Sequence, residues 1–137
     1  MNRAWILAAA LSAGAANAQH QPYAGQHHRD LKALSPEEVK QYMAGAGMGY
    51  AKAAELNQFP GPMHVLELAD QLKLTAEQRA ATQKLMDAHK AQARALGSEL
   101  VAAERELDDL FRAGKVDEAA LARTVRTSAA IVGEYRL

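Results

Sequence analysis

Two histidines stand at helical positions where neighbouring residues could supply further metal ligands. His64 precedes Glu67 by three residues, so both side chains can face one direction, and His89 follows Met86 at the same spacing. If the chain folds back near Leu74, the two pairs could approach each other. Imidazole, carboxylate and thioether ligands suit zinc, nickel, cobalt or copper. The competing interpretation is structural: His89 marks the register of a helical seam, and His64 is a solvated residue at a helix start.

Patterns that indicate catalysis are missing from the sequence. There is no glycine-rich phosphate loop, nucleophile elbow, HExxH motif or Ser/His/Asp order. Adjacent carboxylates such as Asp108 and Asp109 point in different directions on a helix and cannot share a proton. We therefore predict that the protein is not an enzyme and requires no cofactor, with a divalent transition metal as the candidate ligand.

The first 18 residues have the form of a secretory signal peptide. A basic start at residues 1–3 precedes an apolar stretch at residues 4–11, and residues 16–18 have the A-x-A form of a cleavage site. The apolar stretch is shorter than the roughly 20 residues that cross a bilayer. Because the chain has no cysteine, no lipid can be attached there. We expect a mature protein, from Gln19 onward, that is free in the periplasm.

The mature composition favours an all-α fold. Ala, Leu, Glu, Lys, Gln and Arg dominate, and all are good helix formers. The 16 basic and 16 acidic residues balance, which disfavours nucleic acid as a partner. Residues 19–34 are polar, contain His20, His27 and His28, and lack apolar periodicity. They predict a flexible arm ahead of a helical domain at residues 35–137.

Capping signals divide that domain into helices. Ser35 with Glu38 forms a capping box for a first helix, which a run of glycines interrupts, and a short helical piece is expected at residues 50–56. A break at residues 59–62 precedes a second helix from Pro62 to about Lys73. Thr75 with Gln78 forms another capping box, which opens a long helix reaching about Ala113.

Apolar residues along the long helix alternate spacings of three and four, as in a coiled-coil seam. The last helix, capped by Asp117, carries the same spacing, so the two helices should form an antiparallel hairpin. The seam positions are Met86, His89, Ala93, Leu96, Leu100, Ala103, Leu107 and Leu110 on the long helix, and Leu121, Val125, Ser128, Val132 and Tyr135 on the last.

Helix length constrains the architecture further. About 37 residues give a helix of roughly 55 Å, whereas a compact protein of this size is only about 35 Å across. The hairpin must protrude, or a second copy must cover it. We predict an elongated hairpin in a dimeric helical cradle, a homodimer.

Residues 74–78 read Leu-Thr-Ala-Glu-Gln and match an LTxxQ motif, with Leu74, Thr75 and Gln78 as its defining positions. The match stands at the head of a long helix in a cysteine-free, helical chain. It resembles the Spy/CpxP superfamily of periplasmic LTxxQ proteins over residues 34–137. Residues 47–57 and 60–68 resemble its heavy-metal sensor and resistance branch (CnrX/ZraP-like). Family members commonly carry a second such motif after the last helix, so its absence before Leu137 suggests a C-terminal truncation.

The resemblance implies two alternative functions. The first is an ATP-independent stress-response chaperone, which binds unfolded periplasmic clients on a helical surface; Leu96, Leu100, Leu107 and Phe111 are candidates for the client face or the dimer core. The second is a heavy-metal sensor or resistance protein, with His64, Glu67, His89 and Met86 as ligands and a signalling partner in the inner membrane. The sequence leaves both open.

Overall fold

The computed structural model describes residues 22–136, so the predicted signal peptide at residues 1–18 lies outside the described residues. The described chain contains helices and no strands, which confirms the predicted all-α fold with a long central helix. None of its helices is long and apolar enough to cross a membrane. The elements are a short 3₁₀ helix (Gln26–His28), α1 (Pro36–Ala44), α2 (Lys52–Glu55), α3 (Pro62–Glu67), α4 (Ala76–Arg112) and α5 (Glu118–Tyr135).

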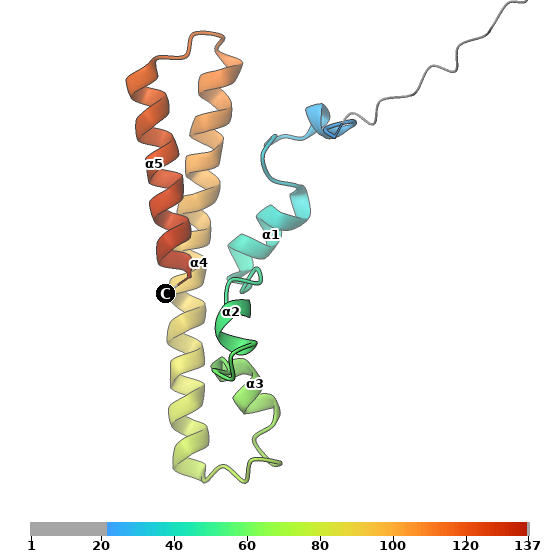
Figure 1. Ribbon diagram of the computed structural model, residues 1–137, viewed down its shortest axis with the longest axis vertical. Helices are drawn as coiled ribbons and strands as arrows, with labels where there is room; N and C mark the ends of the chain where they lie inside the picture. The colour runs from blue at the N-terminus through green and yellow to red at the C-terminus, as the bar shows by residue number, and fades with distance from the viewer. Residues whose placement is uncertain (1–21, 137) are drawn as a thin grey trace, which may run out of the picture.

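α4 is the axis of the molecule. The segment from α1 to α3 runs along one side of α4 (Figure 1). The chain then reverses direction, and α4 runs back along the whole length of the helical domain. α5 then folds back in an antiparallel hairpin and pairs with the C-terminal half of α4. α1 also packs against α4, and α3 lies beside its N-terminal half. The predicted hairpin is therefore present, and it is asymmetric because α5 is only 18 residues long against 37 in α4.

The predicted capping signals form as hydrogen bonds. The Ser35 hydroxyl accepts from the Glu38 amide at 3.2 Å while a Glu38 carboxylate oxygen accepts from the Ser35 amide at 2.7 Å. The Ser35 amide and hydroxyl, which both lie within hydrogen-bond distance of the Glu38 carboxylate, lower the pKa of Glu38. Thr75 and Gln78 make the same reciprocal pair at 3.2 and 3.0 Å, and Asp117 accepts from the Ala120 amide at 2.8 Å. Local sequence therefore sets where these three helices begin.

The second predicted helix ends earlier than the sequence indicated. α3 ends at Glu67 rather than near Lys73. Beyond Glu67 the chain forms turns. The Lys73 amide donates to the Asp70 carbonyl, and the Leu74 amide donates to the Ala69 carbonyl, five residues earlier. Lys73 itself has a φ of 52°, a left-handed conformation that ends a helix. The chain must turn before Thr75 caps α4, and this requirement overrides the helix-forming composition.

The seam on α5 departs from the prediction at one position, where Thr124 rather than Val125 is buried. Val125 is 47% exposed, whereas Thr124 is 1% exposed and faces the interior. Thr124 can be buried because its hydroxyl has partners, the Ala120 carbonyl at 3.1 Å and a Glu106 carboxylate oxygen at 3.3 Å. A satisfied hydroxyl costs little when it leaves water. Hydrophobicity alone favours Val125 as the seam residue at this turn of the helix.

The core lies where α1, α4 and α5 meet, and its buried members are Leu31, Tyr42, Ala93, Leu100, Val101 and Tyr135. Leu31 corrects the prediction of a flexible arm over residues 19–34. It is 3% exposed and belongs to this core, although it stands in a polar stretch. The segment before α1 is therefore anchored to the helical domain at Leu31.

α1 and α4 approach so closely that only glycine fits at position 97. A Cβ atom placed there would lie 2.1 Å from the Tyr42 carbonyl oxygen and 2.7 Å from its carbon. Gly45, which follows Tyr42 by three residues at the end of α1, has a φ of 70° and lies against α4 at Lys90 and Arg94. The end of α1 is thus held against the middle of α4, backbone on backbone.

Gly97→Ala should destabilise the protein. The clash between the added Cβ and the Tyr42 backbone could be relieved only if a helix backbone moved, and overpacking of this kind costs roughly 1–3 kcal/mol. The matched control is Gly133→Ala on α5, where an added Cβ meets nothing within 4 Å; it should raise stability by about 1 kcal/mol through helix propensity. Urea unfolding followed by circular dichroism measures both. Equal stabilisation by the two alanines would contradict the close approach.

Candidate functional site

An apolar groove opens between the segment before α1 and the last turns of α4. Its volume is about 380 Å³. One wall comes from the 3₁₀ helix and its flanks, and the other from a single face of α4. The lining residues are Tyr23, Gln26, His27, Lys32 and Ala33 on the first wall, and Glu104, Leu107, Asp108 and Phe111 on the second.

Helical spacing places the α4 wall. Positions 107, 108 and 111 lie three, four and seven residues after position 104, so the four form one continuous stripe on the helix. Leu107 and Phe111 give the stripe its apolar centre, and Phe111 is 57% exposed. Tyr23 faces them from the other wall and is 75% exposed. Large apolar groups thus remain open to solvent on both sides of the groove.

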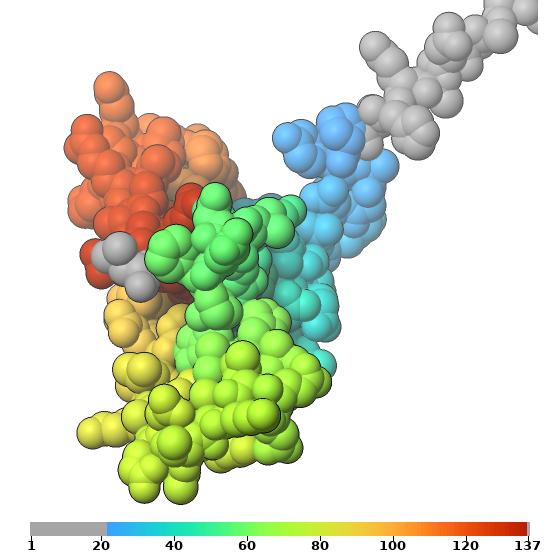
Figure 2. Space-filling model, turned by 60° about the horizontal axis from the view of Figure 1, so that its bottom comes forward, coloured from blue at the N-terminus to red at the C-terminus, as the bar shows by residue number. Residues whose placement is uncertain are grey.

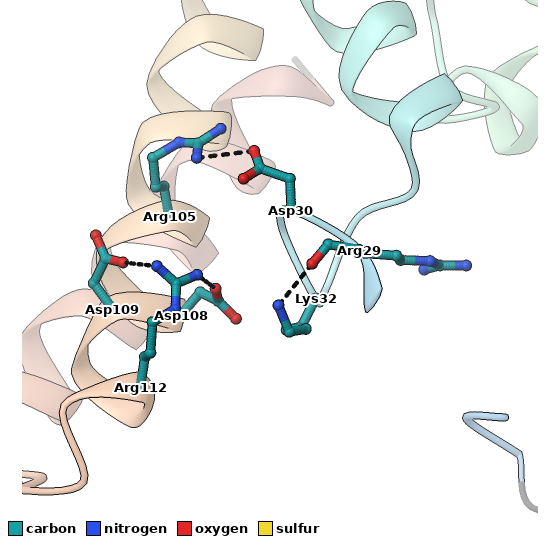
Figure 3. A network of polar contacts seen from close by, with 7 residues as sticks. All are labelled: Arg29, Asp30, Lys32, Arg105, Asp108, Asp109 and Arg112. Carbon is teal, nitrogen blue, oxygen red and sulfur yellow. Dashed lines mark hydrogen bonds and ion pairs between the residues drawn. The ribbon is translucent and has the colours of Figure 1, made fainter. Parts of the chain in front are cut away.

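Two contacts hold the N-terminal wall against α4. Leu31 is buried in the core, and the Asp30 carboxylate accepts from the Arg105 guanidinium at 3.1 Å (Figure 3). Both members of that ion pair are exposed, and exposed pairs contribute only about 0–1 kcal/mol. Full burial of a leucine is worth roughly 1.5–3 kcal/mol. Leu31 is therefore the principal anchor of this wall, and the ion pair sets its direction.

Charges of both signs lie at the border of the groove, with Lys32 on one wall and Glu104 and Asp108 on the other. Figure 3 shows Arg112 donating to two carboxylates of α4, those of Asp109 at 2.8 Å and Asp108. On the opposite wall the Lys32 ammonium donates to the Arg29 carbonyl at 2.6 Å. Arg112 thus pairs with Asp108, and the groove presents an apolar floor between edges of mixed charge.

The four apolar residues proposed for a client or dimer face separate into two groups. Leu107 and Phe111 line the groove. Leu100 is buried in the core, and Leu96 is half-buried against it, so these two serve packing. Tyr23 cannot be predicted as a lining residue from the sequence, because a lone aromatic in a polar segment carries no periodic signal.

The predicted metal ligands occupy different places. His64 lies in α3 and contacts two carboxylates: its Nδ1 is 3.1 Å from Glu67 and its Nε2 is 3.3 Å from Glu55. His89 is exposed on α4 and Met86 is half-buried one turn before it. Within residues 22–136, no group of three or more His, Asp or Glu side chains is arranged to hold a metal ion.

The contacts of His64 explain that finding. A metal ion takes one imidazole nitrogen, and here the two carboxylates flank opposite nitrogens of the same ring. One carboxylate could therefore join the metal while the other would only orient the ring. The described donor set, as arranged, does not fit a metal site.

The LTxxQ residues have a structural role in this conformation. Thr75 and Gln78 cap α4, as described above, and Leu74 is half-buried where the chain enters that helix. The motif thus marks the reversal from α3 into α4.

Comparison with protein families agrees with this motif. A family model described as "LTXXQ motif family protein" matches residues 61–131, about half of the chain. The protein therefore belongs to the LTXXQ motif family, which is the Spy/CpxP-type family. The match does not single out its metal-sensor branch. No curated protein and no solved structure matches the chain significantly.

His64 should titrate above its ordinary pKa of 6.5, because the hydrogen bond with Glu67 and the charge of Glu55 favour the imidazolium. A raised pKa means that protonated His64 stabilises the fold below pH 6.5, and that this stabilisation is lost as the pH rises through the folded-state pKa. Titration of the imidazole by NMR should show that Glu67→Gln lowers the pKa while Glu99→Gln, on α4, leaves it unchanged. An unchanged value in Glu67→Gln would refute the contact.

Proposed function

We propose that this protein is a periplasmic, ATP-independent chaperone of the Spy/CpxP type that binds unfolded clients in the groove between Tyr23 and Phe111. The observation that carries the proposal is the exposure of large apolar side chains on both walls of that groove. Side chains gathered in this way usually mark a binding surface. Membership of the LTXXQ family supports the same function.

The chemistry of the groove suits weak and reversible binding. Its apolar floor would accept leucine, phenylalanine or similar side chains from an unfolded segment, without a requirement for a particular sequence. Its border carries both a basic residue, Lys32, and an acidic one, Glu104, so it would not select clients of one charge type. Since no nucleotide motif occurs in the sequence, a client would leave when its own folding buries the same side chains.

The setting of this function is part of the proposal. The signal-peptide pattern of residues 1–18 supports export to the periplasm. Further large apolar side chains are exposed outside the groove, including Leu56, Phe59 and Leu72, and they support a homodimer that covers some of them. On this proposal the protein is not an enzyme.

Purified protein at substoichiometric concentration should slow the aggregation of a reduced, unfolded test protein, measured by light scattering. Phe111→Ser should weaken client binding about tenfold, because a buried phenylalanine contributes roughly 1.5–3 kcal/mol. Val125→Ser is the matched control, since Val125 is similarly exposed but lies on α5 outside the groove. No protection at large excess would refute the chaperone proposal, and equal loss in both variants would refute the groove.

Heavy-metal binding is the second candidate, because family membership is compatible with it and His64 already has a carboxylate at each ring nitrogen. It requires a rearrangement that brings further ligands such as His89 and Met86 to His64. Calorimetric titration with zinc, nickel, cobalt and copper would then show stoichiometric binding that is lost in both His64→Ala and His89→Ala. Binding that survives both substitutions, or none at all, would eliminate this site.

A further inference from the structure

A second pocket lies on the other side of the core, where the segment around α2 meets the middle of α4 and the end of α5. Its volume is about 400 Å³, within the range of small-molecule sites. Figure 2 shows the α2 segment (green) lying against the C-terminal part of α5 (red). The aromatic rings of Tyr50, Phe59 and Tyr135 form its walls, and His89 of α4 contributes a fourth ring.

The pocket stays open because many of its lining residues are small. Glycines and alanines of the α2 segment, such as Ala51 and Ala54, provide backbone and methyl groups where larger side chains would fill the space. A Cβ added at Gly47 would meet nothing within 4 Å. The Tyr135 ring is held in place, since its hydroxyl donates to the Ala46 carbonyl at 2.7 Å. The aromatic walls therefore surround a space that the protein does not fill.

The charge in this pocket has one sign. Arg136 lines it, with the guanidinium carbon 5.9 Å from the centre of the Tyr50 ring. No aspartate or glutamate of the described chain lines it, and the nearby Glu55 carboxylate is already engaged by His64 at 3.3 Å. A guanidinium beside aromatic rings is suited to bind a carboxylate, because its planar donors match the two oxygens.

We propose that this pocket binds a small aromatic carboxylate, whose ring lies among Tyr50, Phe59 and Tyr135 and whose carboxylate pairs with Arg136. Ring stacking supplies the apolar part of the affinity, and the arginine distinguishes an anion from a neutral analogue. The site is separate from the groove of Tyr23 and Phe111 in its residues, its charge and its position. It does not depend on the chaperone function.

The test compares 2-naphthoate with its neutral analogue 2-naphthamide by calorimetry on the purified protein. The acid should bind about tenfold more tightly, as expected for a charge-assisted hydrogen bond. Arg136→Gln should reduce the acid to the affinity of the amide. The matched control is Arg126→Gln, which removes an exposed arginine of α5 outside the pocket and should change nothing.

A steric variant makes the test independent of Arg136. Ala54→Leu should exclude both compounds by filling the pocket while the circular dichroism spectrum stays unchanged. Equal affinities for acid and amide, an unaltered preference in Arg136→Gln, or no binding at millimolar concentration would each overturn the proposal. Loss of binding in Phe111→Ser would instead assign the compound to the groove, and it would overturn the proposal as well.

Discussion

The contact of α1 with α4 at Gly97 is the constraint on which the rest of the fold depends. Because the carbonyl of Tyr42 occupies the place of a side chain, α1 lies close enough for the Tyr42 ring to reach α5. There it packs edge-on against Tyr135, with ring centres 5.6 Å apart, and its hydroxyl lies 3.0 Å from that of Tyr50. Burial raises the pKa of both Tyr42 and Tyr135, so these two hydroxyls stay protonated at pH values where an exposed tyrosine ionises. The absence of a side chain at Gly97 thereby lets α1 and the residues just after it meet the end of α5, which lies far away in the sequence.

The groove and the aromatic pocket follow from this arrangement. α1 crosses α4 near its middle, so the chain on either side of α1 lies over a different part of α4. The segment before α1 returns to α4 through Leu31 and forms the groove, whereas the segment after α1 stays beside the end of α5 and forms the aromatic pocket. The groove has charges of both signs at its border, while the pocket carries Arg136 and is lined by no aspartate or glutamate of the described chain. These two surfaces therefore select for different chemistry.

The sequence predicted what local interactions determine. Ser35, Thr75 and Asp117 satisfy amides three residues away, so their helix starts could be found from spacing alone. Features that depend on tertiary contacts could not be found in this way. Thr124 replaces Val125 in the seam because Glu106 of α4 provides a partner for its hydroxyl, and Leu31 is buried because α4 passes nearby. For the candidate site, the sequence could not show that Leu107 and Phe111 line the groove while Leu100 is buried in the core, because that division depends on which elements pack against α4. His64 took its carboxylate partners from α2 and α3 rather than approaching His89 as a common site.

The difference in length between α4 and α5 has a consequence for how the protein opens. α5 covers α4 from its C-terminal end to about the middle, and the first turns of α4 have only the short α3 beside them (Figure 1). A helix segment with few tertiary contacts is held mainly by its own hydrogen bonds, and short helices held in this way are only marginally stable in water. Amide hydrogens near Leu85 should therefore exchange with solvent through local fraying, while those near Leu100 should exchange only when the whole domain unfolds. A single unbroken helix thus joins an end that opens locally to an end that opens only when the whole domain unfolds.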